Sequence, residues 1–169
     1  MSAFQILGLE STLLLEEGII KRAYELNSDL EGALEARNIL LNPCERLRVW
    51  MECQNISIVR HSSIPESILN LFSDIASLTT EVNTLHHQRV SSRTTLGQAL
   101  LDKKLFQLKP KIDAIAEQVS SYEQKLVDSF HELESTPEER LANKVYQGLK
   151  FLNKWKTQLD DSYNRLIVC

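Results

Sequence analysis

Hydrophobic residues recur along most of this 169-residue chain at intervals of three and four positions. That spacing places them on one face of an α-helix, and no segment shows the strict alternation that is typical of a β-strand. The strongest stripe lies near the C-terminal end and consists of Leu141, Val145, Leu149, Leu152, Leu159, Tyr163 and Leu166. The pattern predicts an all-α protein.

Two proline motifs mark helix starts. Asn42 is followed by Pro43 and then by an acidic residue at the third helical position, which combines an N-cap, a favourable first residue and a favourable charge. Thr136 and Pro137 repeat this arrangement near the start of the strongest stripe. We therefore expect new helices at both places, the second running nearly to residue 168.

The remaining signals predict two domains. Asp29 is expected to cap a helix and Pro110 to kink or break a long one, while the polar residues 91–95 and Gly97 weaken the helical pattern and indicate a loop. The predicted helices cover residues 14–27, 30–41, 43–51, 65–85, 96–133 and 137–168. We expect a small helical N-terminal domain over residues 1–55, followed by an elongated antiparallel bundle over residues 62–169.

Composition limits the classes of partner and compartment. The net charge is -4 and no sustained basic run occurs, so nucleic-acid binding is not expected. No apolar run approaches membrane-spanning length, so we expect no membrane and a cytoplasmic location. The cysteines Cys44, Cys53 and Cys169 show neither an even count nor C-x-x-C spacing, which argues against a disulfide framework or a zinc site.

Catalytic groups are sparse. His86 and His87 are adjacent, so on a helix they diverge by roughly 100° and cannot face one metal. The Glu-x-x-His pairs of di-iron bundles and the common phosphate-binding and hydrolase motifs are missing from the sequence. Cys44, in the first turn of a helix, is either a thiol of lowered pKa or, as we prefer, a semi-buried structural thiol. We expect no enzyme and no cofactor; a di-metal helical enzyme would require stoichiometric metal.

Recognition surfaces are the remaining possibility. Phe151 lies about a quarter turn outside the strongest stripe, where it either seals a helix edge or contacts a partner. Leu71, Phe72 and Ile75 share a predicted stripe with Ile68, Leu78 and Val82, and that periodicity favours the core. Helix-face charges such as Lys21 and Arg22 are most often simply solvated.

Both ends of the chain resemble one family. The N-terminal matches are Phe4, Gln5, Ile6, Leu7, Gly8, Leu9, Leu15, the run from Ile19 to Leu26, Ala36, Leu40, Asn42, Pro43 and Arg46. They resemble a J-domain, and the spacing from Gly8 and Leu9 to Ile20 is similar to that of the HscB type, the co-chaperones of iron–sulfur cluster assembly. The run from Leu149 to Trp155 is similar to that family's C-terminal signature. The resemblance implies a J-like domain followed by a three-helix bundle.

One departure affects the implied chaperone interaction. J-domains carry a His-Pro-Asp tripeptide between their second and third helices, and it triggers ATP hydrolysis by a DnaK-type chaperone. Here Leu26 is followed by Asn27, Ser28 and Asp29, and roughly twenty residues of the family pattern, including the tripeptide, are missing. We expect stimulation of the chaperone to be absent or impaired. The resemblance places Lys21 and Arg22 on the chaperone-facing helix, with residual docking at best.

The family's surface for the cluster scaffold protein (IscU) is matched more fully in this sequence than its chaperone-binding region. The resemblance places Leu71, Phe72, Ile75 and Phe151 at apolar contact positions. The acidic rim of the family is replaced here by Ala76, Thr79 and Asn83. We therefore expect an HscB-like co-chaperone homologue that binds an IscU-like scaffold through its C-terminal bundle. The alternative is a structural or interaction protein with the same fold and a different protein partner.

Overall fold

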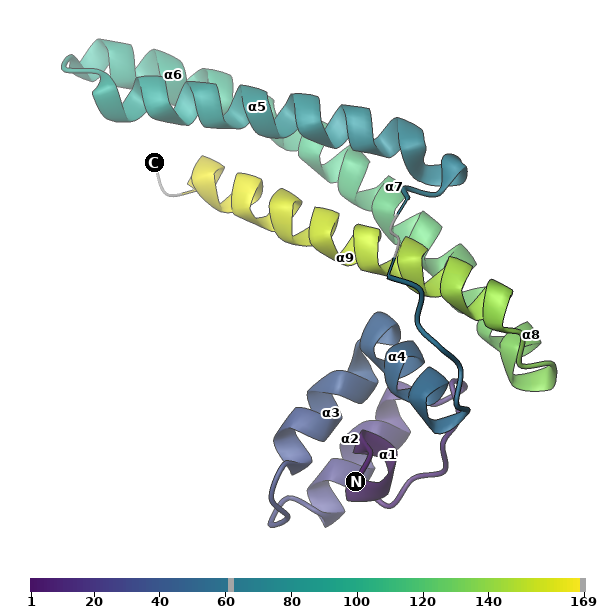
Figure 1. Ribbon diagram of the computed structural model, residues 1–169. Helices are drawn as coiled ribbons and strands as arrows, with labels where there is room; N and C mark the ends of the chain where they lie inside the picture. The colour runs from purple at the N-terminus through teal and green to yellow at the C-terminus, as the bar shows by residue number, and fades with distance from the viewer. Residues whose placement is uncertain (61–62, 168–169) are drawn as a thin grey trace. The chain divides into compact units, whose positions relative to one another are not determined.

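The structure, a computed structural model, describes residues 1–60 and 63–167 (Figure 1). His61 and Cys169, which entered the search for metal-binding and disulfide residues, lie outside this range. All regular elements in the described residues are helical, so the predicted all-α fold is confirmed. They are α1 Ala3–Ile6, α2 Glu17–Leu26, α3 Ala33–Leu41, α4 Pro43–Cys53, η1 Glu66–Ile68, α5 Leu69–Ser91, α6 Thr95–Gln107, α7 Lys109–Asp128, α8 Phe130–Ser135 and α9 Glu139–Ile167. None of the described helices combines the length and apolar character that crossing a membrane requires.

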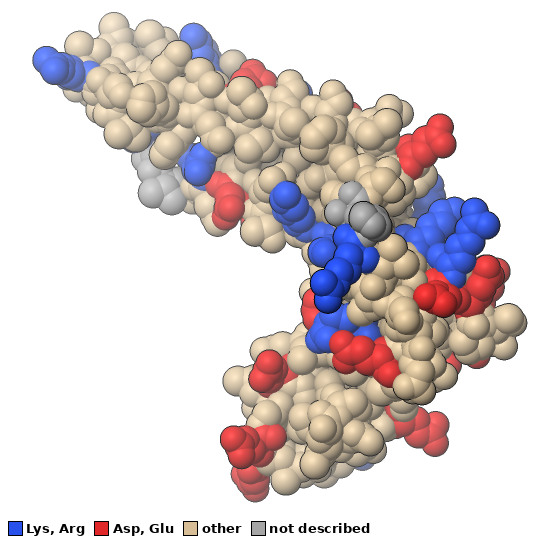
Figure 2. Space-filling view, in the orientation of Figure 1, with Lys and Arg blue, Asp and Glu red and all other residues tan. Residues whose placement is uncertain are grey.

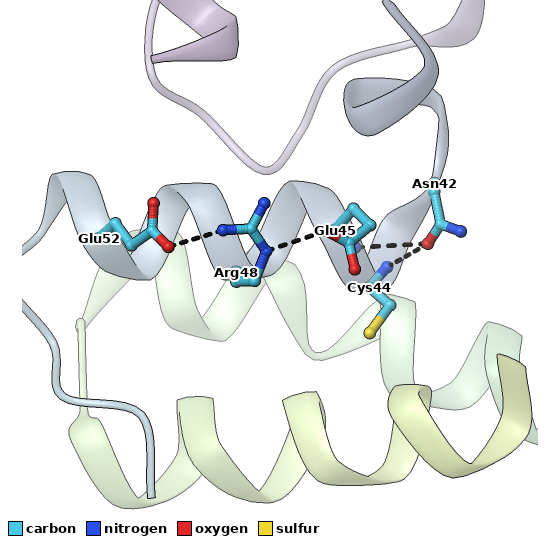
Figure 3. Close-up of polar contacts among 5 residues, drawn as sticks. All are labelled: Asn42, Cys44, Glu45, Arg48 and Glu52. Carbon is cyan, nitrogen blue, oxygen red and sulfur yellow. Dashed lines mark hydrogen bonds and ion pairs between the residues drawn. The ribbon is translucent and has the colours of Figure 1, made fainter. Parts of the chain in front are cut away.

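The start of α4 is as predicted. The Asn42 side-chain oxygen accepts hydrogen bonds from the backbone N–H groups of Cys44 and Glu45, at 3.0 and 3.3 Å (Figure 3). Arg48 then pairs with Glu45 at 2.9 Å and with Glu52 at 2.7 Å along the same helix. The hydrogen bond that Arg48 donates to the Glu45 carboxylate is the main reason that the pKa of Arg48 is raised above its ordinary value. These contacts fix the first turn of α4 and support its exposed side.

Other predicted boundaries were wrong by a few residues. α3 begins at Ala33 rather than after Asp29, because a turn brings Gly32 to the N-cap position with φ of 80°, a left-handed conformation that suits glycine. α9 begins at Glu139, two residues after Pro137. The short helix α1 was not predicted, and α8 is separate from α7, whereas a single helix had been predicted to run to residue 133. The break at Pro110 was predicted correctly, since α6 ends at Gln107 and α7 begins at Lys109.

By its contacts the chain forms two compact units. Unit 1 contains Met1–Ser63 and Gln124–Lys150, and unit 2 contains Ile64–Glu123 and Phe151–Cys169. This division differs from the predicted domains, which placed residues 124–150 with the C-terminal part. The reason is hydrophobic: in unit 1, α8 and the first half of α9 share one core with the N-terminal helices. This core includes Phe4, Leu7, Leu13, Ile20, Leu40, Leu47, Trp50, Met51, Phe130, Leu133, Ala142, Val145 and Leu149.

Arg46 is a buried cation within unit 1. It is only 8% exposed, and its Nη1 donates hydrogen bonds to the carbonyl oxygens of Leu15 and Leu40 at 3.1 and 3.2 Å. Its guanidinium carbon lies 5.8 Å from the centre of the Phe130 ring. Burial lowers the pKa of Arg46 from its ordinary value. Carbonyl dipoles and an aromatic face thus solvate a charge that links the N-terminal segments to α8.

The connector after α4 is held by two polar residues of α9. Asn143 donates from Nδ2 to the Ser57 carbonyl at 2.9 Å and accepts from the Val59 N–H at 2.8 Å. Gln147 donates from Nε2 to the Val59 carbonyl at 2.9 Å. Asn143 and Gln147 are both buried, so their amides replace the water that extended backbone would otherwise require.

The Asn143→Ala variant should lower the free energy of unfolding by about 2 kcal/mol, because two hydrogen bonds to the connector are lost and its polar groups stay buried. Urea denaturation followed by circular dichroism measures this change. Lys144→Ala, at the exposed neighbouring position, is the matched control and should have little effect. Equal effects of the two substitutions would contradict the role assigned to Asn143.

Candidate protein-binding surface

Unit 2 is built from α5, α6 with the adjoining part of α7, and the second half of α9. Arg89 pairs with Asp102, and Lys111 pairs with Glu81 at 3.3 Å, which sets α5 antiparallel to α6 and α7. α7 and α9 are antiparallel as well. Lys156 of α9 contacts Glu123 of α7 at 2.6 Å, and Lys109 lies 5.8 Å from the centre of the Tyr163 ring.

An aromatic cluster lies where the beginning of α5 meets the second half of α9. The centre of the Trp155 ring is 6.4 Å from that of Phe72 and 6.0 Å from that of Phe151, and both pairs are tilted by 39°. These separations fall within the range favoured by aromatic pairs. Trp155 is 3% exposed and forms the floor of the cluster.

Exposure divides the four predicted contact residues into two pairs. Leu71 and Ile75 are 2% and 1% exposed, so they belong to the core and present no surface to a partner. This corrects their placement at a binding surface, although periodicity had already favoured the core for them. Phe72 is 47% exposed and Phe151 is half-buried. Leu69, which was not predicted, is 50% exposed one turn before Phe72.

Helical geometry explains this division. Leu71, Ile75, Leu78 and Val82 repeat at intervals of three and four residues and are all buried. Phe72 follows Leu71 by one residue, or roughly 100° around the helix, so it was wrongly assigned to that stripe. Phe151 precedes Leu152 of the α9 stripe by one residue and lies at the equivalent shoulder. The shoulder test that singled out Phe151 would also have found Phe72. We call Phe72 and Phe151, which pack on Trp155, together with Leu69, one turn from Phe72, the aromatic patch.

The α5 surface beside the aromatic patch is uncharged. Ala76, Thr80 and Asn83 are exposed and follow Phe72 along one side of the helix. The acidic residues of α5 lie elsewhere on its circumference, and one of them, Glu81, pairs with Lys111. On α9, Lys154 is exposed one turn after Phe151. The patch is therefore apolar, and the side of α5 next to it carries no acidic residue that could attract a basic partner.

Lys21 and Arg22 lie on α2 in unit 1, whereas the aromatic patch belongs to unit 2. Both are exposed, and Lys21 forms an ion pair with Glu17 one turn earlier. A hydrogen bond from Lys21 is the main cause of a lowered pKa at Glu17. This arrangement is that of an ordinary solvated helix face, and it leaves Arg22 accessible.

Metal-ligating side chains are scattered in the part of the chain that the structure describes. No group of three or more His, Cys, Asp or Glu side chains in that part could hold a metal ion. Cys44 is buried in the core of unit 1. Tyr146 belongs to the same core, and its burial is the main reason that its pKa is raised above the ordinary value. A hollow of about 450 Å³ beside α3 and α4 is open and lined by Leu34, Glu35, Asn38, Ile39, Asn42 and Glu45, without a nucleophile beside a base.

Comparison of the chain with protein-family models, with curated proteins and with solved structures found no match. The HscB-type resemblance therefore rests on the residues quoted for it. The aromatic patch is the feature of the structure that a function can be built on.

Leu71→Ala should lower the free energy of unfolding by about 2–5 kcal/mol, because it leaves a cavity in the core of unit 2. Phe72→Ala should cost about 1 kcal/mol or less, since much of its ring is already in water. Urea denaturation of the two variants measures the contrast. A loss from Phe72→Ala as large as that from Leu71→Ala would show that Phe72 is a core residue.

Proposed function

We propose that this protein is an HscB-like co-chaperone homologue that binds a client through the aromatic patch, and that the client is an iron–sulfur scaffold protein of the IscU type. The observation that carries the proposal is an exposed Phe72 and a half-buried Phe151 packed on a buried Trp155. The residue order at both ends of the chain supports the choice of client.

The patch has the physical features of a binding anchor. A large apolar side chain gains about 1.5–3 kcal/mol when it passes from full exposure to full burial, so one that is already half-buried gains roughly half of that when a partner covers it. Both phenylalanine rings already pack against Trp155, and this contact reduces the side-chain entropy that is lost on binding. A few anchors of this kind, surrounded by neutral contacts, commonly dominate the affinity of a protein interface.

The contact set differs from that expected from the sequence. Phe72 and Phe151 remain as anchors, and Leu69 joins them. Leu71 and Ile75 act from beneath, because their burial in the core fixes the face of α5 that carries Phe72.

Chaperone stimulation is not part of the proposed activity. In place of the tripeptide loop, α2 and α3 are joined by the short segment Asn27–Gly32. Asn27 donates from Nδ2 to the carbonyl oxygens of Leu7 and Ala23, so its side chain serves the fold of this turn. Lys21 and Arg22 would supply only residual electrostatic docking to a DnaK-type chaperone.

The neutral surface beside the patch favours a second candidate. Ala76, Thr79 and Asn83 offer no charge to a partner, and charge complementarity contributes strongly to the selection of one partner among several. A structural or interaction protein that retained the fold and acquired another protein partner would show the same aromatic patch with a different rim.

Phe72→Ala should weaken binding of a purified IscU-type scaffold about thirtyfold, as expected for a central anchor worth about 2 kcal/mol. Calorimetric titration measures the dissociation constants of the wild type and the variant. Leu96→Ala is the matched control, because Leu96 is 72% exposed on α6, outside the patch, and should change the affinity less than twofold. Equal affinities of the wild type and Phe72→Ala, or no binding by either, would contradict the proposal.

Adding the protein to a DnaK-type chaperone should leave its single-turnover rate of ATP hydrolysis unchanged, because the tripeptide is missing. An authentic J-domain protein serves as the positive control. Acceleration by this chain that disappears in the double variant Lys21→Ala, Arg22→Ala would show that α2 acts without the tripeptide.

A further inference from the structure

The end of the α5–α6 hairpin combines exposed apolar side chains with unpaired cations. Val90 at the end of α5 is 67% exposed, and Leu96 and Leu100 of α6 are 72% and 55% exposed. Such large apolar residues are normally exposed singly rather than in a group at one tip. Their position around the connection from Ser92 to Thr94 makes this tip a candidate binding surface.

α6 differs from the amphipathic helices of the chain because it is apolar on two sides. Its inward side carries the buried Leu105, whereas Leu96 and Leu100, four residues apart, share an outward side. A surface helix normally keeps its outward side polar. The outward side of α6 is therefore suited to burial against something that the described residues do not supply.

The tip lies beyond the end of α9 within unit 2. Lys109, the first residue of α7, contacts Tyr163, which is one turn from the last residue of α9. α6 therefore extends past the point where α9 ends, as Figure 1 shows. Among the residues that the structure describes, α5 and α6 pack on each other at the tip without a third helix, which leaves Val90, Leu96 and Leu100 exposed.

The fully exposed charges at the tip are basic. Arg93, Lys103 and Lys104 are exposed, and none of them forms an ion pair with a described residue. Asp102 is partly buried and pairs with Arg89. In the view of Figure 2 the end of this hairpin is mostly uncharged surface with Lys and Arg side chains on it. In a chain of net charge -4, this local excess of cations selects an anionic counterpart.

We propose that the hairpin tip is a peripheral binding site for an anionic lipid surface. Exposed apolar side chains are present on both helices of the tip, with Val90 on α5 and Leu96 and Leu100 on α6. A fluid bilayer interface can accommodate them without a complementary pocket, which a folded protein partner would have to provide. Val90, Leu96 and Leu100 enter the headgroup region while Arg93, Lys103 and Lys104 stay at the level of the phosphates. Apolar insertion alone or electrostatic attraction alone gives only weak attachment to a membrane, and the tip supplies both. The absence of a spanning segment had suggested no membrane, but a protein can lie on a bilayer without crossing it.

Binding of the full-length chain to two kinds of vesicle tests the proposal. The protein should cosediment with vesicles of phosphatidylcholine mixed with an equal part of phosphatidylserine, and only weakly with phosphatidylcholine alone. The triple variant R93Q, K103Q, K104Q should lower the partition coefficient about a hundredfold, at about fivefold for each cation. The matched control K144Q, K150Q, K154Q removes the same charge from exposed sites on α9 and should retain most of the binding.

A fluorescence measurement locates the contact. Trp50 and Trp155 are 1% and 3% exposed, so their emission should respond little to vesicles. In the Leu96→Trp variant a third, exposed indole should shift its emission to the blue when phosphatidylserine vesicles are added. Equal loss of binding in both triple variants, or no shift from Leu96→Trp, would overturn the proposal. Failure of the wild-type protein to bind vesicles would also overturn the proposal. If the protein then bound an acidic amphipathic peptide instead, the tip would be assigned to a protein partner.

Discussion

The apolar stripe of α9 is the feature on which both units depend. Val145 and Leu149 of this helix are buried in the core of unit 1, and Leu152, Trp155 and Leu159 are buried in unit 2. A charged residue substituted into this stripe would be buried without a partner and would destabilise the core of the unit that contains it. The residues beside the stripe are then available for other roles. Asn143 and Gln147 bind the connector in unit 1, and Phe151 packs on Trp155 in unit 2.

Local capping was predictable from the sequence, whereas turn geometry was not. Asn42 and Pro43 mark the start of α4 because their effect depends only on neighbouring backbone N–H groups. Asp29 carries a similar signal, yet α3 begins four residues later. The backbone bends through Gly32 first, and that bend is stabilised by hydrogen bonds from the N–H groups of Leu30 and Ala33 to the carbonyls of Asn27 and Leu30. Sequence spacing cannot rank such competing turns.

Half of the candidate site followed from periodicity. Phe151 was recognised because it lies off its stripe, and Phe72 would have been recognised by the same reasoning with its angle counted from Leu71. The contact between these two rings through Trp155 could not be predicted, because it depends on the alignment of α5 with α9. The assignment of residues 124–150 to unit 1 could not be predicted from the sequence either. It depends on burial of Phe130 and Leu133 among N-terminal helices that are distant in the sequence.

Charge distribution gives the two surfaces of unit 2 different physical characters. Its segments contain nine acidic and nine basic residues, so the excess of acidic residues in the chain belongs to unit 1. A neutral unit provides little long-range steering, and affinity at the aromatic patch must then come from desolvated contact, with weak dependence on salt. The hairpin tip concentrates three of the basic residues, so attraction there is local and falls within a Debye length. Salt therefore separates the two surfaces experimentally: attachment at the tip weakens as ionic strength rises, while contact through Phe72 and Phe151 persists.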